Sequence, residues 1–318
     1  MCITNPKVTV LMPAYNAGRF IGEAIESILA QSFTDYELLI VNDGSTDDTL
    51  EVIGSFNDER IVLINQENAG VASALNTGLS HSKAPYIARF DADDICYHHR
   101  LKVQFDFITS YPEYNIIGTN AMYVDVEGNY LFNFKSPALT NEDIQRLNYR
   151  ICPFIHSSVM YKKDIVVNNG GYNLYAYTFE DHFLWRNILK KGKAWIIPEP
   201  MIKISLNPGS VTIDEKWRPF KFRRLKYAAL KTAAITRSQG DQLHKIGEKQ
   251  YNNKVKEGAY YALCAKKYLL NNFKPKKARV HIVNAIGCRP LRLENYLLYA
   301  VSFLPKQMIN RLHDIIPA

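Results

Sequence analysis

The sequence predicts an α/β fold, in which a mixed, mainly parallel sheet carries helices on both faces and is followed by a basic helical C-terminal region. Three observations lead to this expectation. Strand-like and helix-like segments alternate over the first hundred residues, acidic clusters follow two of the strand-like segments, and the balance of charge reverses after residue 215. Alternation of this kind is typical of parallel strands joined by crossover helices.

The alternation can be followed segment by segment. Strands, rich in β-branched and apolar residues, are expected at 7–13, 36–43, 60–65 and 84–91. Helices, with apolar residues three and four positions apart, are expected at 18–31, 45–56 and 69–82, and Ser45 and Thr46 suit the N-cap of the second. Because ligands of such sheets bind outside the carboxyl ends of the strands, the acidic clusters at 42–47 and 91–94 should meet there.

Further elements extend this domain to residue 215. They are a helix at 100–110, a hairpin at 115–134 with its turn at 127–129, a helix near 140–150, a strand near 157–162 and a helix at 178–192. Pro198, Pro200 and Pro208 indicate a loop-rich exit, because proline cannot donate to a strand ladder. We therefore place one domain at 1–215 and a second region at 216–318.

The two regions differ in charge. Residues 1–215 contain 17 Lys and Arg against 26 Asp and Glu, a net charge of −9, and residues 216–318 contain 22 against 5, a net charge of +17. A basic region of this kind is typical of a surface that binds a polyanion such as nucleic acid, an anionic membrane leaflet or a phosphorylated lipid. A solvated basic face that only aids solubility is the simpler alternative.

Composition indicates the class of protein and its compartment. The hydrophobic share of 47% and the charged share of 22% are those of an ordinary globular protein. The five cysteines are odd in number and include no CxxC pair, which favours a reducing compartment. The N-terminus has no signal-peptide pattern, and the apolar run at 296–305 is about half of the ~20 residues that a membrane span needs. We therefore expect a cytoplasmic protein, peripheral on the inner face of the membrane.

The acidic cluster at 91–94 indicates the chemistry. No GxGxxG follows the first strand and no GxxxxGK[ST] occurs, which argues against dinucleotide and P-loop sites. Asp91, Asp93 and Asp94 instead follow a strand, and carboxylates can hold Mg²⁺ or Mn²⁺, which in turn binds diphosphate oxygens. If the backbone stays extended, Asp91 and Asp93 lie on one side and Asp94 points away.

Four stretches, taken together, resemble one known family. They are "VLMPAYNAGRFIGEAIESILAQSFTDYELLIVNDGSTDDT", "QENAGVASALNTGL", "FDADD" with "RLKVQ", and "FEDHFLWR". This ordered set is similar to the family 2 glycosyltransferases, which are inverting, nucleotide-sugar-dependent enzymes of the Rossmann-like GT-A fold. The likeness covers about residues 7–205, and it implies a nucleotide-sugar half at about 1–95 and an acceptor half at about 96–215.

The resemblance implies roles for residues on the nucleotide side. Pro13, Ala14 and Tyr15 would lie against the base, and Asp43 would accept a hydrogen bond from it. Asn76 would belong to the same site, although Leu75 stands where many relatives have arginine.

It also implies roles around the diphosphate and the acceptor. Asp91 and Ala92 would face the ribose and diphosphate, and Asp93, with Asp91, would bind Mn²⁺ or Mg²⁺. Asp181 would be the general base. Apart from the resemblance, His156 is a candidate for a role at the metal, the diphosphate or the acceptor. The alternative is a structural role, which is more common for a lone histidine before a strand.

Neighbouring side chains have open alternatives. Glu180 would raise the pKa of the base if the two carboxyl groups are close, but adjacent helical residues point about 100° apart. Trp185 could line the acceptor pocket or pack in the core. Arg100, with Leu101 and Gln104, is expected to hold the helix after the acidic cluster.

The expected activity is the metal-assisted transfer of one hexosyl unit in surface polysaccharide biosynthesis. The donor would be a nucleotide-sugar, with UDP favoured by its frequency in the family, and the acceptor a saccharide or a lipid-diphosphate-linked saccharide. No QxxRW signature of processive synthases occurs. A sugar-nucleotidyltransferase would need a glycine-rich basic loop after the first strand, and a nucleic-acid-binding protein does not suit a larger domain of net charge −9. The basic region would bind an anionic membrane or form a homodimer.

Overall fold

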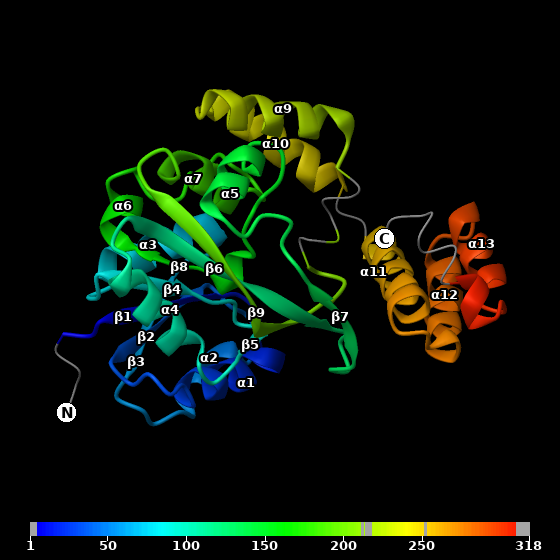
Figure 1. The fold of residues 1–318 in the computed structure, drawn as a ribbon, viewed down its shortest axis with the longest axis horizontal. Coiled ribbons are helices and arrows are strands. Elements are labelled where there is room, and N and C mark those ends of the chain that lie inside the picture. The colour runs from blue at the N-terminus through cyan, green and yellow to red at the C-terminus, as the bar shows by residue number, and fades with distance from the viewer. Residues whose placement is uncertain (1–4, 211–212, 214–217, 251–252, 310–318) are drawn as a thin grey trace. The chain divides into compact units, whose positions relative to one another are not determined.

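The computed structural model describes residues 5–210, 213, 218–250 and 253–309 (Figure 1). The chain forms two compact units, the first comprising Met1–Ala121, Phe134–Ile204 and Arg223–Leu243, and the second Met122–Asn133, Ser205–Phe222 and His244–Ala318. The expected domain boundary between residues 215 and 216 lies outside the described residues and stays a prediction.

Four parallel strands form one half of the sheet. They are β1 (Val8–Ala14), β2 (Tyr36–Asp43), β3 (Ile61–Gln66) and β4 (Tyr86–Arg89). The connecting helices are α1 (Gly18–Leu29), α2 (Thr49–Gly54) and α3 (Val71–His81). The strands agree with the expected ones to within two residues at each end.

Helices cover both faces of this half. Along β1, Leu11 belongs to the core cluster that includes α3, whereas Val10 and Met12 point to the opposite face, and all three are fully buried. Successive residues of a strand point to opposite faces, so full burial of both sets means that neither face meets water.

The other half of the sheet is mixed. The strand order is β3-β2-β1-β4-β8-β6-β9-β5, and β7 pairs with β6 off this path. The added strands are β5 (Asp94–Cys96), β6 (Tyr114–Val124), β7 (Tyr130–Phe134), β8 (Met160–Lys162) and β9 (Lys193–Ser205). The remaining elements up to β9 are α4 (Arg100–Ser110), α5 (Asn141–Leu147), η1 (His156–Ser158), α6 (Lys163–Val167) and α7 (Glu180–Ile188). Strand β8 runs antiparallel to β4, where the parallel half ends.

The expectation of a loop around Pro198 and Pro200 is wrong, because both prolines lie inside the thirteen-residue strand β9. Strand β9 lies between β6 and β5 in the sheet, and β5 pairs with it at Ile202, Lys203 and Ile204. The prolines therefore lie where β5 demands no backbone donor, and the Pro198 carbonyl still accepts a hydrogen bond from Asn120 Nδ2 at 2.7 Å. Proline is tolerated in strands at such positions.

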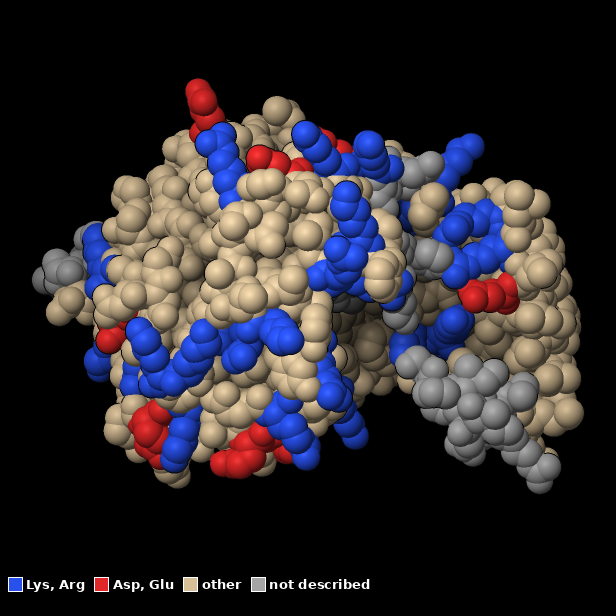
Figure 2. All heavy atoms as spheres, turned by 90° about the horizontal axis from the view of Figure 1, so that it is seen from above, with Lys and Arg blue, Asp and Glu red and all other residues tan. Residues whose placement is uncertain are grey.

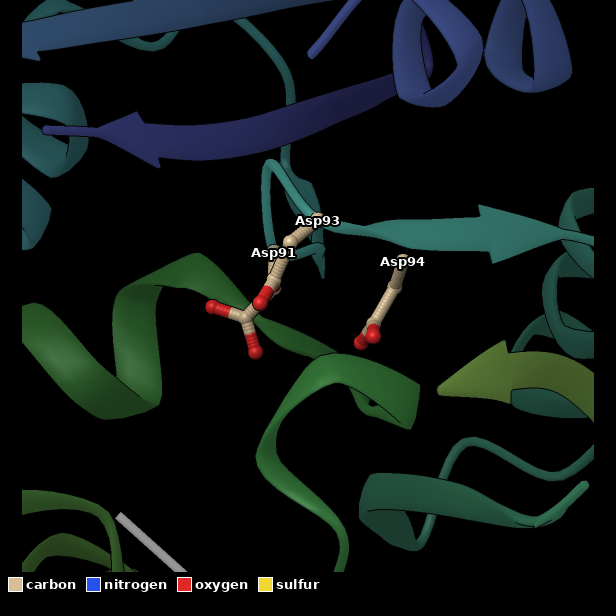
Figure 3. Close-up of side chains that lie close together, drawn as sticks. All are labelled: Asp91, Asp93 and Asp94. Atoms are coloured by element: carbon tan, nitrogen blue, oxygen red, sulfur yellow. The ribbon is translucent and has the colours of Figure 1, made fainter. Parts of the chain in front are cut away.

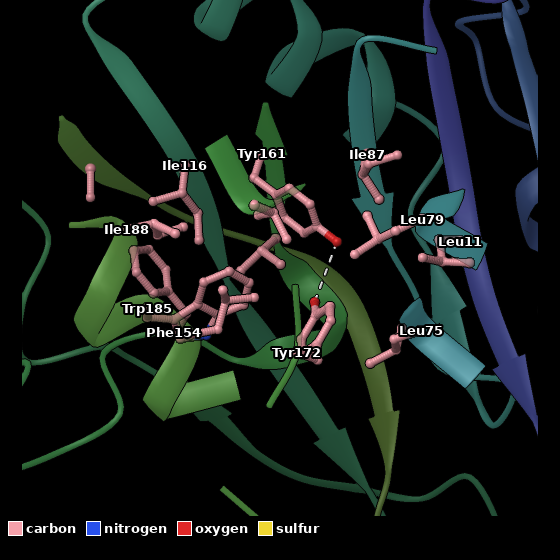
Figure 4. Packing of buried hydrophobic residues seen from close by; sticks show 14 of the residues in the cluster. Leu11, Leu75, Leu79, Ile87, Ile116, Phe154, Tyr161, Tyr172, Trp185 and Ile188 are labelled. Atoms are coloured by element: carbon pink, nitrogen blue, oxygen red, sulfur yellow. Dashed lines mark hydrogen bonds between the residues drawn. The ribbon is translucent and has the colours of Figure 1, made fainter. Parts of the chain in front are cut away.

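The main core lies between the sheet and helices α3 and α7 (Figure 4). Trp185 of α7 is fully buried and packs edge-to-face against Phe154, with ring centroids 6.0 Å apart. Tyr161 and Tyr172 are also buried and their hydroxyl groups lie 3.3 Å apart. Of the two roles considered for Trp185, core packing is therefore the one that the structure supports.

Helices dominate the C-terminal part of the chain. They are α9 (Phe220–Thr232), α10 (Arg237–Gln250), α11 (Asn253–Lys266), the π-helix η2 (Lys267–Asn271), α12 (Pro275–Cys288) and α13 (Leu293–Val301). In the second unit, Asp125 accepts from the backbone N–H of Glu127 and Asn129, which forms the expected turn between β6 and β7. Tyr268 of η2 donates to the same carboxylate. Within the described residues, every helix is too short or too polar to cross a bilayer.

Candidate functional site

The carboxyl ends of β1 and β2 are joined by short polar contacts. The Asn16 backbone N–H donates to Ser45 Oγ at 3.0 Å, and the Thr46 N–H donates to Asn16 Oδ1 at 2.8 Å. Helix α2 begins only at Thr49, whose N–H donates to Asp47 Oδ1 at 3.1 Å. The caps expected from Ser45 and Thr46 are therefore wrong, since both residues connect strand ends instead.

Asp43, the last residue of β2, is buried and organises the loop before α3. Its carboxylate accepts from Gln66 Nε2 at 2.6 Å and from the N–H groups of Ala69 and Gly70, both at 2.9 Å. A carboxylate offers about four acceptor positions, so about one remains for a ligand. The structure thus gives Asp43 a structural task beside the base-binding role that the resemblance implies.

The residues expected against the base lie at the end of β1. Ala14 pairs with Asn42 of β2 and is 2% exposed, and Pro13 precedes it in the strand. Tyr15 follows the strand and is 53% exposed. An exposed aromatic ring beside buried strand ends is able to stack on a flat ligand.

The acidic cluster lies in a turn between β4 and β5. The Asp94 N–H donates to the Asp91 carbonyl at 3.4 Å, and carboxylate oxygens of Asp91, Asp93 and Asp94 all lie within 4.8 Å of one another. Figure 3 shows the three side chains pointing to the same side of the turn. The expectation that Asp94 points away is wrong, because the alternation of an extended strand does not hold in a turn.

A buried arginine stands behind this cluster. Arg89, at the end of β4, is 3% exposed and forms an ion pair with Asp91. Burial has the largest single effect and lowers the pKa of Arg89, but the charge and the hydrogen bond of Asp91, with smaller contributions from Tyr172 and Asp94, together outweigh it, so the pKa is raised. Burial first, and then the charges of Asp93 and Asp91, raise the pKa of Asp94 well above its usual range. Among the described residues, Arg89 and Arg100 both interact electrostatically with Asp94.

The donor set suits a hard divalent cation. Three carboxylates supply oxygen ligands only, and Mg²⁺ and Mn²⁺ prefer such ligands together with phosphate oxygens and water. Asp91 and Asp93 are partly exposed and Asp94 is buried, so the first two can reach a ligand from solvent. The repulsion among the three carboxylates would be relieved by a bound cation.

The turn is supported from below by buried polar groups. Arg100 is fully buried and donates from Nη2 to the Arg89 carbonyl at 2.8 Å, and its Nε donates to Gln104 Oε1 at 3.0 Å. The Asp91 N–H donates to Ser157 Oγ at 3.0 Å. The structural role expected for Arg100 and Gln104 is confirmed by these contacts.

Asn76 of α3 connects to a segment almost a hundred residues away. Its Nδ2 donates to the Tyr172 carbonyl and its Oδ1 accepts from the Tyr172 N–H, both at 2.8 Å. Gly171, with a φ of +71°, comes so close that an added Cβ would lie 2.5 Å from Asn76 Oδ1. Leu75 is buried in the core. The amide of Asn76 is thus engaged in holding the 170–179 loop.

Changing Asn76 to alanine should therefore destabilise the fold more than it weakens nucleotide binding. Loss of both hydrogen bonds leaves the Tyr172 backbone groups without these partners, which we expect to lower the free energy of unfolding by about 1–3 kcal/mol. Urea unfolding measures this change, and calorimetry with UDP measures affinity. Asn76→Asp can accept a hydrogen bond but cannot donate one, so its free energy of unfolding should lie between those of the wild type and Asn76→Ala. A tenfold or larger loss of affinity with unchanged stability, roughly 1.4 kcal/mol of binding, would instead support the nucleotide contact.

His156 faces a tyrosine and not the acidic cluster. Its Nε2 lies 3.1 Å from the Tyr172 hydroxyl, and its ring lies 5.9 Å from that of Trp185. Burial first, and then the charge of Arg89, lower the pKa of His156 well below its usual range, so the imidazole is neutral at pH 7. Among the described residues, the group able to hold a metal consists of three aspartates without His156. Its metal role stays a prediction.

Asp181 lies in the first turn of α7, after a strained residue. Thr178 has a φ of +63°, which is unusual for a β-branched side chain and typical of strain at functional positions. Asp181 is partly exposed, and its Oδ1 accepts from the His182 N–H at 2.6 Å. The Cys152 thiol donates to Asp181 Oδ2 at 3.5 Å. Burial first, and then the charge of Asp181, raise the pKa of Cys152 well above its usual range, so the thiol keeps its proton.

Glu180 is buried beside this group. Burial first, and then the charge of Asp181, raise the pKa of Glu180 to about 7. Arg89 lowers the same pKa and Asp91 raises it, so α7 begins within electrostatic reach of the acidic cluster. The charge of Asp181 thus acts on Glu180, whereas the expectation that Glu180 raises the pKa of the base stays a prediction.

The raised pKa of Glu180 predicts a pH-dependent stability. The folded state binds this proton more tightly than the unfolded chain, so the stabilisation is complete below pH 4.5 and is lost as pH rises to about 7. Glu180→Gln should therefore be more stable than the wild type at pH 8, by up to about 3 kcal/mol, and equal to it near pH 4. Urea unfolding across this range measures the difference. Glu142→Gln, at an exposed position in the first turn of α5, should retain the wild-type pH profile.

Three residues of the site escaped prediction from the sequence. Arg89 lies two residues before Asp91, and a basic residue at the end of an apolar strand was the signal that could have marked it. Cys152 has no local signal, because its partner Asp181 is 29 residues away. Lys226 of α9 lies 5.5 Å from the Phe179 ring centroid and acts electrostatically on Cys152. Because Lys226 lies in a basic helix, it had been expected on the surface that binds a membrane or a second copy.

Comparison with known proteins gives one family. The model of glycosyl transferase family 2 matches residues 9–169. The Bacillus subtilis (strain 168) protein EpsE, named as a glycosyltransferase, is 33% identical over 211 residues, which cover 63% of this chain and 73% of EpsE. The Erwinia amylovora protein AmsE, named as an amylovoran biosynthesis glycosyltransferase, is 29% identical over 237 residues, which cover 71% of this chain and 88% of AmsE.

Two solved structures share the fold. S. aureus TarS 1–349 in complex with UDP has a TM-score of 0.55 at 16% identity, covering 97% of this chain and 91% of that one. The Pyrobaculum calidifontis mannosyltransferase PcManGT in complex with GDP-Man and Mn²⁺ has a TM-score of 0.52 at 17% identity, covering 98% and 88%. The mainly parallel sheet with helices and a helical C-terminal region is confirmed as a GT-A type fold.

Proposed function

Because this chain belongs to glycosyl transferase family 2, we propose that it transfers one hexosyl unit from a nucleotide-sugar, foremost a UDP-sugar, to a hydroxyl group of its acceptor with inversion at the anomeric carbon. The acceptor is a saccharide or a lipid-diphosphate-linked saccharide. The observation that carries the proposal is the approach of Asp91, Asp93 and Asp94 to within 4.8 Å at a strand end, with the first turn of α7 in electrostatic reach.

The proposed reaction is a single displacement. Asp181 takes the proton from the acceptor hydroxyl, whose oxygen forms a bond to the anomeric carbon while the bond from that carbon to the diphosphate oxygen breaks. Attack from the face opposite the diphosphate inverts the configuration. A divalent cation held by Asp93 and Asp91 would offset the charge that develops on the leaving diphosphate. Partly exposed Asp181 is accessible to an acceptor.

The relatives support the biological setting. AmsE carries amylovoran biosynthesis in its name, and we propose a comparable role for this chain in surface polysaccharide biosynthesis. The structure of TarS contains UDP and that of PcManGT contains GDP-Man with Mn²⁺, which supports a nucleotide-sugar donor and a divalent cation without choosing between bases. We propose that the enzyme acts at the cytoplasmic face of the membrane, where lipid-linked acceptors are accessible.

Thermal unfolding with different nucleotides tests the donor class. The panel consists of UDP, GDP, dTDP and CDP, each with and without Mn²⁺. A ligand present at 100 times its Kd stabilises a protein by about 2.7 kcal/mol, so a bound nucleotide should raise the Tm clearly. We expect UDP with Mn²⁺ to give the largest shift. If none of the four shifts the Tm of a folded protein in the presence of Mn²⁺, the proposed function is wrong.

A further inference from the structure

Helix α13 has its polar and apolar sides reversed for a helix on a globular protein. Asn295 and Ser302, seven residues apart, are 3% and 2% exposed, whereas Leu293 and Leu297 are 76% and 67% exposed. A surface helix normally buries its apolar stripe and exposes its polar one. The core of the second unit therefore does not explain why these positions are leucine.

Contacts with α12 fix which side of α13 faces outward. Arg279 of α12 donates from Nη1 to the Ser302 carbonyl at 3.4 Å, and its guanidinium lies 4.5 Å from the Phe303 ring centroid. Asn295 and Ser302 lie on that side of the helix. Leu293 and Leu297, two residues before and after Asn295, are rotated about 160° from it at 3.6 residues per turn. They point away from α12.

The uncovered residues form a patch that begins before the first residue of the helix. We define the apolar face as Leu291, Leu293, Tyr296 and Leu297, which are between 46% and 95% exposed. Single exposed apolar residues are normal, but adjoining large ones mark an interaction surface.

The charge of the surrounding helices indicates what this face contacts. Residues 253–309 contain 11 Lys and Arg against 2 Asp and Glu, a net charge of +9. Lys276, Lys277 and Lys306 are exposed. Figure 2, which shows one side of the molecule, has more Lys and Arg side chains than Asp and Glu. A second copy would bring the same positive charge and be repelled, whereas an anionic surface would be attracted.

We infer that α13 docks on an anionic lipid bilayer, with the apolar face inserted among the acyl chains near the headgroups and the basic side chains of α12 and its neighbours on the phosphates. A helix with one large apolar side and flanking lysines lies in the plane of a membrane interface in this way. The inference adds to the proposed function the surface that brings the enzyme to a lipid-linked acceptor. Docking itself requires no donor and no acceptor.

Vesicle sedimentation tests the inference without an activity assay. The full chain is mixed with vesicles of phosphatidylcholine containing roughly one third phosphatidylglycerol, and with pure phosphatidylcholine. We expect binding to the anionic vesicles that weakens at high salt, and at least about tenfold weaker binding to the neutral ones. Leu293→Ser combined with Leu297→Ser should weaken anionic binding at least about tenfold. Leu50→Ser combined with Val167→Ser, at exposed positions of the first unit, is the matched control and should bind as the wild type.

Three other outcomes overturn the inference. Equal binding of the wild type and the α13 variant means that another surface holds the membrane. A wild type that stays in solution with anionic vesicles, but forms a dimer in ultracentrifugation that the α13 variant cannot form, means that a second copy covers this face. If binding fails while UDP with Mn²⁺ still raises the Tm, only the docking surface is wrong. If binding succeeds and no nucleotide raises the Tm, only the proposed function is wrong.

Discussion

Asp93→Ala should abolish transfer while leaving the protein folded. We expect kcat/KM to fall by at least about 10³-fold, because both the cation and its stabilisation of the leaving diphosphate depend on this carboxylate. The Tm shift given by UDP with Mn²⁺ should disappear in parallel. Donor consumption measured with UDP-sugars, beside the thermal shift, tests both effects on one preparation.

The variant should be at least as stable as the wild type when no cation is present. After burial, the charge of Asp93 raises the pKa of Asp94 most, so its removal relieves repulsion in the turn. Asp91 would keep its ion pair with Arg89. A normal or raised Tm without Mn²⁺, together with lost activity, separates a damaged site from a damaged fold.

Asp106→Ala provides the matched control. Asp106 lies on α4, soon after the cluster, with a side chain that is 54% exposed and paired with Lys102. Exposed pairs of this kind contribute about 0–1 kcal/mol, so activity and the response to Mn²⁺ should remain. If Asp93→Ala kept full activity, or if Asp106→Ala lost as much, the acidic cluster would not hold the cation.

The sequence was sufficient where local patterns decide the structure. Strand β2 was expected at 36–43 and is found at Tyr36–Asp43. The reason is that an apolar run between turn signals is typical of a buried strand in a parallel sheet. The acidic cluster at 91–94 was likewise placed at a strand end, since the preceding apolar run ends there. These features depend on residues that are close in the chain.

The details that sequence reasoning missed depend on distant residues. Whether Asp94 points toward Asp91 is decided by a turn that includes a hydrogen bond to Ser157, 66 residues away from Asp91. The engagement of Asn76 depends on Tyr172, which is 96 residues away. Strand β9 can include Pro198 because β5 pairs with residues further along that strand. Periodicity carries no information on such partners, so the side chains of a site are harder to predict than its location.

Asp181→Asn should lose most of the activity through kcat while donor binding stays intact. The amide has the shape of the carboxylate and can still accept from the His182 N–H, but it cannot take a proton from the acceptor hydroxyl. General-base removal costs about 10²–10⁴-fold, and we expect kcat to fall within this range. The KM for the donor should change by less than about threefold, because α7 acts on the acceptor. Steady-state kinetics with varied donor separates the two parameters.

The neighbouring carboxyl group makes this prediction decisive. Glu180 is buried and has a pKa of about 7, a value that suits a base at neutral pH, whereas Asp181 is the one that is partly exposed. Glu180→Gln should reduce kcat less than Asp181→Asn and shift its pH profile, because Glu180 acts on Asp181 through charge. If Glu180→Gln instead caused the larger loss, Glu180 would be the base, and Asp181 would be the residue that raises its pKa.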